Sequence, residues 1–99
     1  MTVNIIATLQ ALPGKEDQLL DVLRQVMAPT LAEAGNLRYE LYRSIANPAV
    51  FTFVEKFADA AAFDVHHNAP HSVALRAAVA GLLAHAPSIE QQTEVAAPV

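Results

Sequence analysis

The sequence predicts an α+β domain of the ferredoxin-like type, with the element order β-α-β-β-α-β and a four-stranded antiparallel sheet. Two observations predict this fold. Four segments alternate between apolar and polar residues, as strands do, and two others repeat apolar residues at helical spacing. The length of 99 residues suits one domain. We expect it to span residues 1–99, with an ordered core over about residues 3–95 and a frayed tail over 96–99.

The first half of the chain contains a strand, a long helix and a second strand. Residues 3–10 alternate with period two and predict the first strand. Residues 15–34 carry apolar side chains at helical spacing, although Pro29 should kink the last turn and Gly35 suits the helix C-cap. Residues 36–44 alternate again and predict the second strand.

The second half contains a strand, two helices and a last strand. Residues 50–57 pair with the preceding strand as a hairpin. Asp59 can cap a short helix over residues 60–66, and a proline opens a longer helix over residues 70–84. Alternation over residues 89–95 allows a final strand.

The expected topology leaves one face of the sheet open. The two crossover connections have the same hand, so both main helices pack on one face. Hydrophobic residues make up 54% of the chain, more than a small monomer hides easily. We therefore expect two open faces to pack together in a symmetric homodimer.

Composition argues against several functional classes. The net charge of −4 and the lack of a basic stripe predict that the protein does not bind nucleic acid. No segment approaches the roughly 20 apolar residues that span a bilayer, and no signal peptide is evident, so we expect a cytoplasmic protein. With no cysteine, three glycines and no nucleotide motif, the sequence predicts no cysteine-bound metal and no nucleotide cofactor.

Glu55 is the most unusual residue of the predicted sheet. It shares one strand face with Phe51, Phe53 and Phe57. A buried carboxylate either pairs with a donor or has its pKa raised. Glu55 is therefore either an acid, a base or a group that orients one, or a structural carboxylate paired with a helix end or an arginine.

Three histidines follow within six residues. His67 and His71 have the i, i+4 spacing of a metal site, but Pro70 interrupts it, and we predict no metal site. His66 and His71 lie at a helix junction and are candidates for carrying a proton or binding a ligand. The alternative is that they are solvated or capping residues.

Other polar residues give weaker indications. Asn4 and Thr8 share a face of the first strand and could orient a ligand or satisfy one another. Arg38, Arg43 and Arg76 could neutralise an anionic substrate, although surface exposure is their ordinary state.

Several of these residues form a pattern that resembles a known family. The pattern comprises Glu55, Phe57, Asp59, Phe63, His66, Pro70 and His71, preceded by Glu33, Gly35 and Tyr39 and by the turn Asn47-Pro48. Over about residues 3–95 the sequence resembles the antibiotic biosynthesis monooxygenase family of dimeric α/β barrel proteins, which includes quinol monooxygenases.

The resemblance implies a homodimeric barrel with a pocket between sheet and helices. It also implies oxygenation of a quinol or related phenolic compound by O2 without metal, flavin or haem. Carried over to this chain, His66 would accept a proton or bind the substrate hydroxyl, Glu55 would orient a neighbour, and Asn4 would hold the substrate oxygen. The implied substrate-binding residues are Tyr39, Phe53, Phe57, His71 and Thr8.

Many family members carry Trp where this chain has Phe57, so we do not expect haem degradation. Two other functions remain open from the sequence. Proton transfer by His66 and Glu55 would also suit an isomerase or tautomerase acting on a small carbonyl compound. A non-catalytic barrel that binds small molecules is the third possibility.

Overall fold

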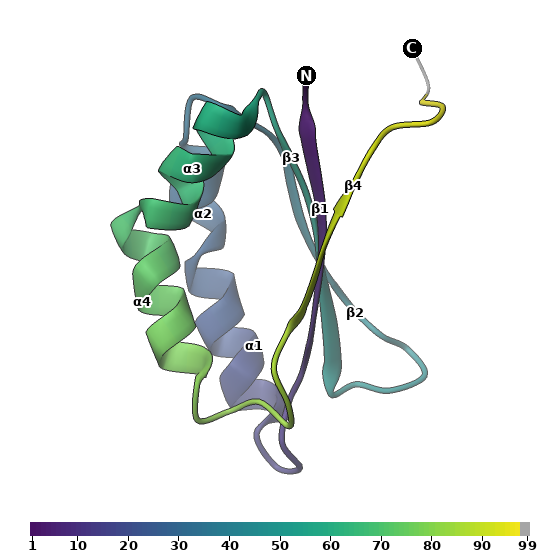
Figure 1. Ribbon diagram of the computed structural model, residues 1–99. Helices are drawn as coiled ribbons and strands as arrows, with labels where there is room; N and C mark the ends of the chain where they lie inside the picture. Colours follow the sequence, from purple (N-terminus) through teal and green to yellow (C-terminus); the bar gives the residue numbers. More distant parts are fainter. Residues whose placement is uncertain (98–99) are drawn as a thin grey trace.

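The computed structural model describes residues 1–97 and has two layers, a sheet and a layer of helices that covers one of its faces (Figure 1). The strands are β1 (Val3–Gln10), β2 (Asn36–Arg43), β3 (Val50–Phe57) and β4 (Ser88–Gln92). The helices are α1 (Glu16–Gln25), α2 (Met27–Leu31), α3 (Ala60–Asn68) and α4 (Pro70–Val79). Of the predicted tail, residues 98 and 99 lie outside the described range.

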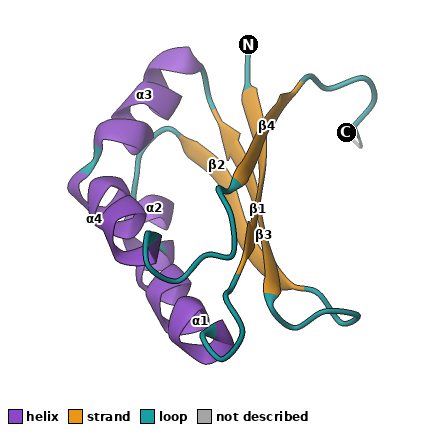
Figure 2. Ribbon diagram, turned by 60° about the horizontal axis from the view of Figure 1, so that its bottom comes forward, coloured by secondary structure: helices purple, strands orange, loops and turns teal. Residues whose placement is uncertain are grey.

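The sheet confirms the predicted ferredoxin-like topology. Its strand order is β2-β3-β1-β4, and each neighbouring pair is antiparallel. Figure 2 shows the helices on one side of the four strands and the other side uncovered. Side chains alternate along β1 and β3 between a buried face, against the helices, and a half-buried open face.

The first predicted helix is broken into two. Pro29 has no N–H to donate to the carbonyl of Gln25, and its ring crowds that carbonyl. The chain accordingly leaves α-helical geometry at Val26, one turn earlier than predicted, and α2 ends at Leu31. The single helix predicted over residues 15–34 was therefore wrong in both its continuity and its end.

Gly35 serves packing rather than helix capping. The helix before it ends with Ala32 as its C-cap, and Gly14 is the glycine with a positive φ in the described chain. A Cβ built on Gly35 would lie 2.3 Å from the Cβ of Ala62 in α3. Gly35 therefore allows α3 to approach the turn that follows α2.

We expect Gly35→Ala to destabilise the fold by about 1–3 kcal/mol, because the added methyl group forces α3 away from this turn. Gly81→Ala is the matched control, since a Cβ there meets no described atom within 4 Å. Urea unfolding of both variants measures the difference. Equal stabilities would show that α3 moves freely.

The bounds of α3, α4 and β4 agree only in part with those predicted from the sequence. Asp59 caps α3 as predicted, accepting a hydrogen bond from the Ala62 amide at 2.8 Å. Pro70 opens α4 as predicted, but the helix ends at Val79 instead of near residue 84. The last strand covers residues 88–92 instead of 89–95.

The chain leaves α4 early because its next segment pairs with the end of β1. The Leu12 amide donates to the Leu82 carbonyl at 2.9 Å, and the Ala84 amide donates to the Gln10 carbonyl at 2.8 Å. Backbone groups that bond across to a strand cannot also extend the helix. The periodicity of apolar residues does not reveal that these backbone groups bond to the end of β1 instead of extending α4.

The core lies between the sheet and the helices. The fully buried side chains include Phe51 and Phe57 of β3 and Leu19 and Leu23 of α1. The open face is more polar than we expected. Its central cross-strand row reads Glu40, Val54, Ile6 and Glu90.

Candidate active site

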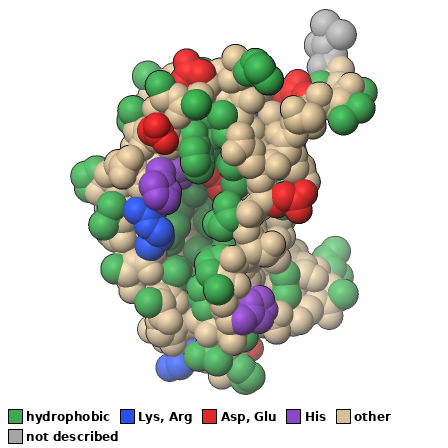
Figure 3. Space-filling view, in the orientation of Figure 1, with side chains coloured by type: hydrophobic (Ala, Val, Ile, Leu, Met, Phe, Trp, Pro, Cys, Tyr) green, Lys and Arg blue, Asp and Glu red, His purple; other side chains and the backbone are tan. Residues whose placement is uncertain are grey.

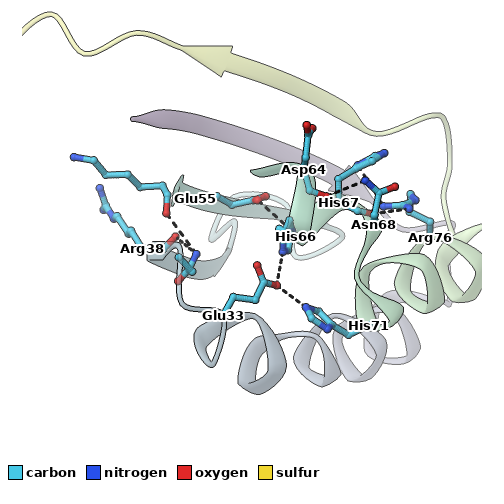
Figure 4. A network of polar contacts seen from close by, with 11 residues as sticks. Glu33, Arg38, Glu55, Asp64, His66, His67, Asn68, His71 and Arg76 are labelled. Carbon is cyan, nitrogen blue, oxygen red and sulfur yellow. Dashed lines mark hydrogen bonds and ion pairs between the residues drawn. The ribbon is translucent and has the colours of Figure 1, made fainter. Parts of the chain in front are cut away.

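Four titratable side chains from distant parts of the sequence meet between the sheet and the helices (Figure 4). Glu33 follows α2, Glu55 lies on β3, His66 is near the end of α3, and His71 is in the first turn of α4. Their side chains are largely buried, with 8–10% exposed for Glu33, Glu55 and His66 and 21% for His71. Side chains from the turn after α2, from β3 and from the junction of α3 and α4 therefore form one polar cluster.

Glu33 is the centre of this cluster. Its Oε2 lies 2.8 Å from Nδ1 of His66 and 2.6 Å from Nε2 of His71. These are the lengths of strong N–H···O hydrogen bonds to a carboxylate. The other oxygen, Oε1, is buried and has no hydrogen-bond partner among the described residues. The carboxylate therefore depends on the two histidines for its stabilisation.

Glu55 lies on the other side of His66. Its Oε1 is 3.8 Å from Nε2 of His66, beyond hydrogen-bond length. Burial, together with the negative charge of Glu33, raises the pKa of the Glu55 carboxyl to about 7. At neutral pH the group is thus divided between a carboxylate that can accept a proton and an acid that can donate one.

Aromatic rings enclose the imidazole of His66. Its centroid lies 4.8 Å from the ring of Phe57, 5.6 Å from Tyr39 and 6.4 Å from Phe63. Tyr39 in turn stacks on Phe53 at 5.1 Å. Burial and the charge of Glu55 raise the pKa of Tyr39, so this phenol stays neutral. The cluster lies in surroundings of low polarity, where charge interactions are strong.

The three neighbouring histidines lie in different environments. α3 begins after its cap at Asp59, and near its end the buried His66 faces inward while the adjacent His67 is exposed. Arg76 of α4 donates to the backbone carbonyl of His67 at 2.9 Å, which ties the two helices together. His71 then reaches Glu33 from the first turn of α4.

The structure brings most of the predicted site residues together. Glu55, His66, His71, Tyr39, Phe53 and Phe57 all lie on or against the buried face of the sheet. Asn4 and Thr8 do not join them. Both alternate on β1 with the buried Val3, Ile5, Ala7 and Leu9, so they lie on the open face.

Within one chain, Asn4 therefore does not share a site with His66, Tyr39 and Phe53, although the resemblance implied a role in substrate binding or catalysis for all four. A side chain on a strand reaches only one face of its sheet. The catalytic role of Asn4 and the substrate-binding role of Thr8 stay predictions. They would require a site on the open face.

Sequence reasoning did not select Glu33 as a site residue. It appeared only as the acid two positions before Gly35 in the family pattern. The contacts of Glu33 span 33 and 38 residues along the chain, so no local spacing links it to His66 or His71.

The cluster also contains the donor atoms that a transition metal prefers. Glu33, His66 and His71 each offer one ligand atom, and these atoms lie within 4.8 Å of one another. Ligands around a tetrahedral ion with bonds of about 2.0–2.1 Å are roughly 3.3 Å apart. The observed N···O distances of 2.6 and 2.8 Å are shorter and are those of atoms joined by a proton.

A hollow opens on the side of the molecule where β4 faces the helical layer. Figure 3 shows hydrophobic side chains lining it, between the helices and the sheet. A pocket of about 360 Å³ lies between the end of α4 and the segment that follows it. The lining residues are Arg76, Val79, Ala80, Leu83, His85, Ala86 and Pro87. This mostly apolar pocket, with the guanidinium of Arg76 in its lining, suits a mostly apolar small molecule.

A comparison with known protein families assigns most of this chain to one family. Residues 2–78 match the antibiotic biosynthesis monooxygenase family. The chain belongs to this family. The matched region contains Glu33, Glu55, His66 and His71, so the polar cluster lies wholly within the family domain.

Individual relatives agree with this assignment. Rv0793 of Mycobacterium tuberculosis, provisionally named a monooxygenase, is 33% identical over 81 residues, which cover 82% of this chain and 79% of that protein. Its solved structure superposes over the whole of both chains with a TM-score of 0.94, at 26% identity. The structure of PA3566 from Pseudomonas aeruginosa has a TM-score of 0.90 and 33% identity, covering 96% of this chain and 95% of that one.

Within residues 1–97, no helix has the length and apolar character needed to cross a bilayer.

Proposed function

We propose that this protein is a monooxygenase that oxidises a quinol or related phenolic compound with O2 and without a bound cofactor. The observation that carries the proposal is the placement of His66. Its imidazole is held by Glu33, lies beside Glu55 and is enclosed by aromatic rings. Membership of the antibiotic biosynthesis monooxygenase family supports the same reaction class.

The first step would be removal of a phenolic proton. His66 donates its Nδ1–H to Glu33, which leaves the lone pair of Nε2 to accept the proton. Transfer of an electron from the resulting phenolate to O2 and recombination of the two radicals form a carbon–oxygen bond. A quinol and O2 then give a hydroxyquinone and water, so the substrate supplies all the electrons that reduce O2.

Glu55 would act on the opposite side of the reacting group. As a neutral acid it donates a hydrogen bond to a substrate carbonyl or to the developing oxyanion. As a carboxylate it stabilises the imidazolium of His66, whose Nε2 is 3.8 Å away. The aromatic enclosure formed by Tyr39, Phe57 and Phe63 keeps water from the reactive intermediates.

A second candidate function is isomerisation or tautomerisation of a small carbonyl compound. The observation that favours it is the adjacent pair of His66 and Glu55, which can remove and return a proton without O2. Dependence on O2 separates the two reactions. A pocket that binds ligands without turnover would support the third, non-catalytic interpretation.

The deciding experiment is O2 uptake by chelator-treated protein with a panel of reduced quinols and anthrones, followed by mass spectrometry of products formed under ¹⁸O₂. We expect uptake above autoxidation and one labelled oxygen atom in the product. Lack of uptake with every substrate would overturn the oxygenase proposal. Uptake that requires added metal would overturn its cofactor-independent part.

We also propose that the protein is a homodimer in which the open faces of two sheets pack together. The centre of this face carries the adjacent pair Val54 and Ile6, both half-buried in one chain. Face-to-face packing would bury them and would enclose Asn4 and Thr8 between subunits.

Val54→Lys should convert the dimer to a monomer. A lysine here lies beside Glu40 on the neighbouring strand and is tolerated in one chain, but the proposed dimer would bury one additional cation from each subunit. Light scattering after size exclusion should show the mass of two chains for the parent protein and one for the variant. Val73→Lys, on exposed α4, is the control. A monomeric parent protein would contradict the proposal.

A further inference from the structure

We infer that Glu33 is the positioning residue of this site and that it fixes His66 as the Nδ1–H tautomer. The catalytic meaning of this inference rests on the proposed function. The tautomer itself is a property of the resting protein and does not depend on any reaction.

The geometry around His66 gives its two ring nitrogens different roles. Nδ1 lies 2.8 Å from Oε2 of Glu33, and an ionised carboxylate only accepts hydrogen bonds. Nδ1 must therefore carry the proton. Nε2 lies 3.8 Å from Glu55, too far for a hydrogen bond, and keeps its lone pair. The base is thus directed away from Glu33, toward the β3 side of the cluster.

His71 maintains the acceptor that this arrangement needs. A buried carboxylate tends to take up a proton unless donors stabilise its charge. His71 supplies the shorter bond to Oε2, at 2.6 Å, while Oε1 has no partner among the described residues. If Glu33 became neutral, its hydroxyl could donate a hydrogen bond to Nδ1 of His66, and the ring proton would then lie on Nε2. The second histidine therefore protects the orientation of the first.

Glu33 would also stabilise the reaction directly. When Nε2 of His66 accepts the phenolic proton, the ring becomes a cation that still donates to Glu33. A carboxylate behind an imidazole base lowers the energy of that cation without becoming protonated. A merely structural Glu33 would instead tie α3 and α4 to the turn after α2, and would affect stability but not the tautomer.

Two substitutions separate the role of Glu33 as a hydrogen-bond acceptor from the role of its negative charge. Glu33→Met removes both the acceptor and the charge at similar volume. Glu33→Gln keeps a carbonyl oxygen that can accept from both rings but removes the charge. Asp21→Asn, at an exposed position on α1, is the matched control, because it makes the same carboxylate-to-amide change away from the cluster and from the open face of the sheet.

The measurement is two-dimensional ¹⁵N NMR of the histidine rings in the resting protein, with kcat and KM determined in parallel. We expect Nδ1–H for His66 in the parent protein, Asp21→Asn and Glu33→Gln, and mainly Nε2–H in Glu33→Met. We expect kcat to fall about 10-fold in Glu33→Gln and about 100-fold in Glu33→Met, with KM changed less than about threefold.

The spectra decide the inference even if no oxygenation is found. An Nε2–H tautomer in the parent protein, or an unchanged Nδ1–H tautomer in folded Glu33→Met, would overturn it. If Glu33→Met does not fold, retention of Nδ1–H in the parent protein with an unaltered kcat in Glu33→Gln would overturn the stabilising role. Absence of O2 uptake by the parent protein contradicts the proposed function alone.

Discussion

Replacing His66 with alanine is expected to lower kcat for oxygenation by roughly 10²–10⁴-fold, the usual contribution of a general base. The substrate would lose its proton acceptor, while the aromatic surfaces that bind it would remain. The loss should therefore appear in kcat more than in KM. Initial rates of O2 uptake over a range of quinol concentrations, corrected for autoxidation, measure both constants.

Two further variants test whether a loss of activity in His66→Ala comes from loss of the base or from a disturbed fold. Alanine at position 66 leaves the buried Glu33 with one donor, so His66→Gln, whose amide can still donate to Glu33, tests whether folding is responsible. His67→Ala changes the exposed neighbour on the same helix and should retain full activity. A His66→Ala enzyme as fast as the parent protein would remove His66 from the mechanism.

Local sequence patterns predicted the parts of the site that depend on one element. Period-two alternation placed Glu55 beside Phe53 and Phe57 on the buried face of β3, and the structure confirms this. The cap at Asp59 and the proline at position 70 located the helix junction correctly. Each of these features is set by residues within a few positions of one another.

The parts that were not predicted arise from contacts between elements. Glu33 reaches His66 and His71 only because α2 ends at Leu31 and the chain turns under α3, where Gly35 permits close packing. Asn4 resembles a pocket residue in the sequence. Its face of β1 is decided by which alternate residues the helices cover.

This difference matters for the proposed mechanism. In that mechanism the strand β3 supplies the acid, α3 supplies the base, and the turn after α2 supplies the group that orients the base. No one of these elements would hold the arrangement alone, since an unpaired buried carboxylate is costly. A substitution in any of the three should therefore alter both stability and chemistry.

Glu55 should make the protein less stable as the pH rises. Its pKa in the folded chain is about 7, compared with an ordinary value of 4.5, so the folded state holds the proton that the unfolded state has already lost. Below about pH 4.5 both states are protonated and the carboxyl carries no penalty. Between pH 4.5 and 7 the free energy of unfolding falls, by about 3 kcal/mol in total at 1.36 kcal/mol per pKa unit.

Glu55→Gln should remove this pH dependence, because the amide has the shape of the neutral acid and never ionises. We expect the variant to match the parent protein near pH 4.5 and to exceed its free energy of unfolding by about 3 kcal/mol at pH 8. Guanidinium unfolding at both pH values measures the difference. Because Glu33, His66 and Tyr39 face Glu55 from the other elements, only the difference between the two proteins is attributed to Glu55.

The opposite result would also be informative about mechanism. A difference that does not change with pH would mean that the pKa of Glu55 is the same in the folded and unfolded chain, so that Glu55 is a carboxylate at neutral pH. Glu55 could then accept a phenolic proton but could not donate a hydrogen bond to an oxyanion. The stability profile of one conservative variant therefore decides whether Glu55 can act as an acid in the proposed mechanism or only as a base.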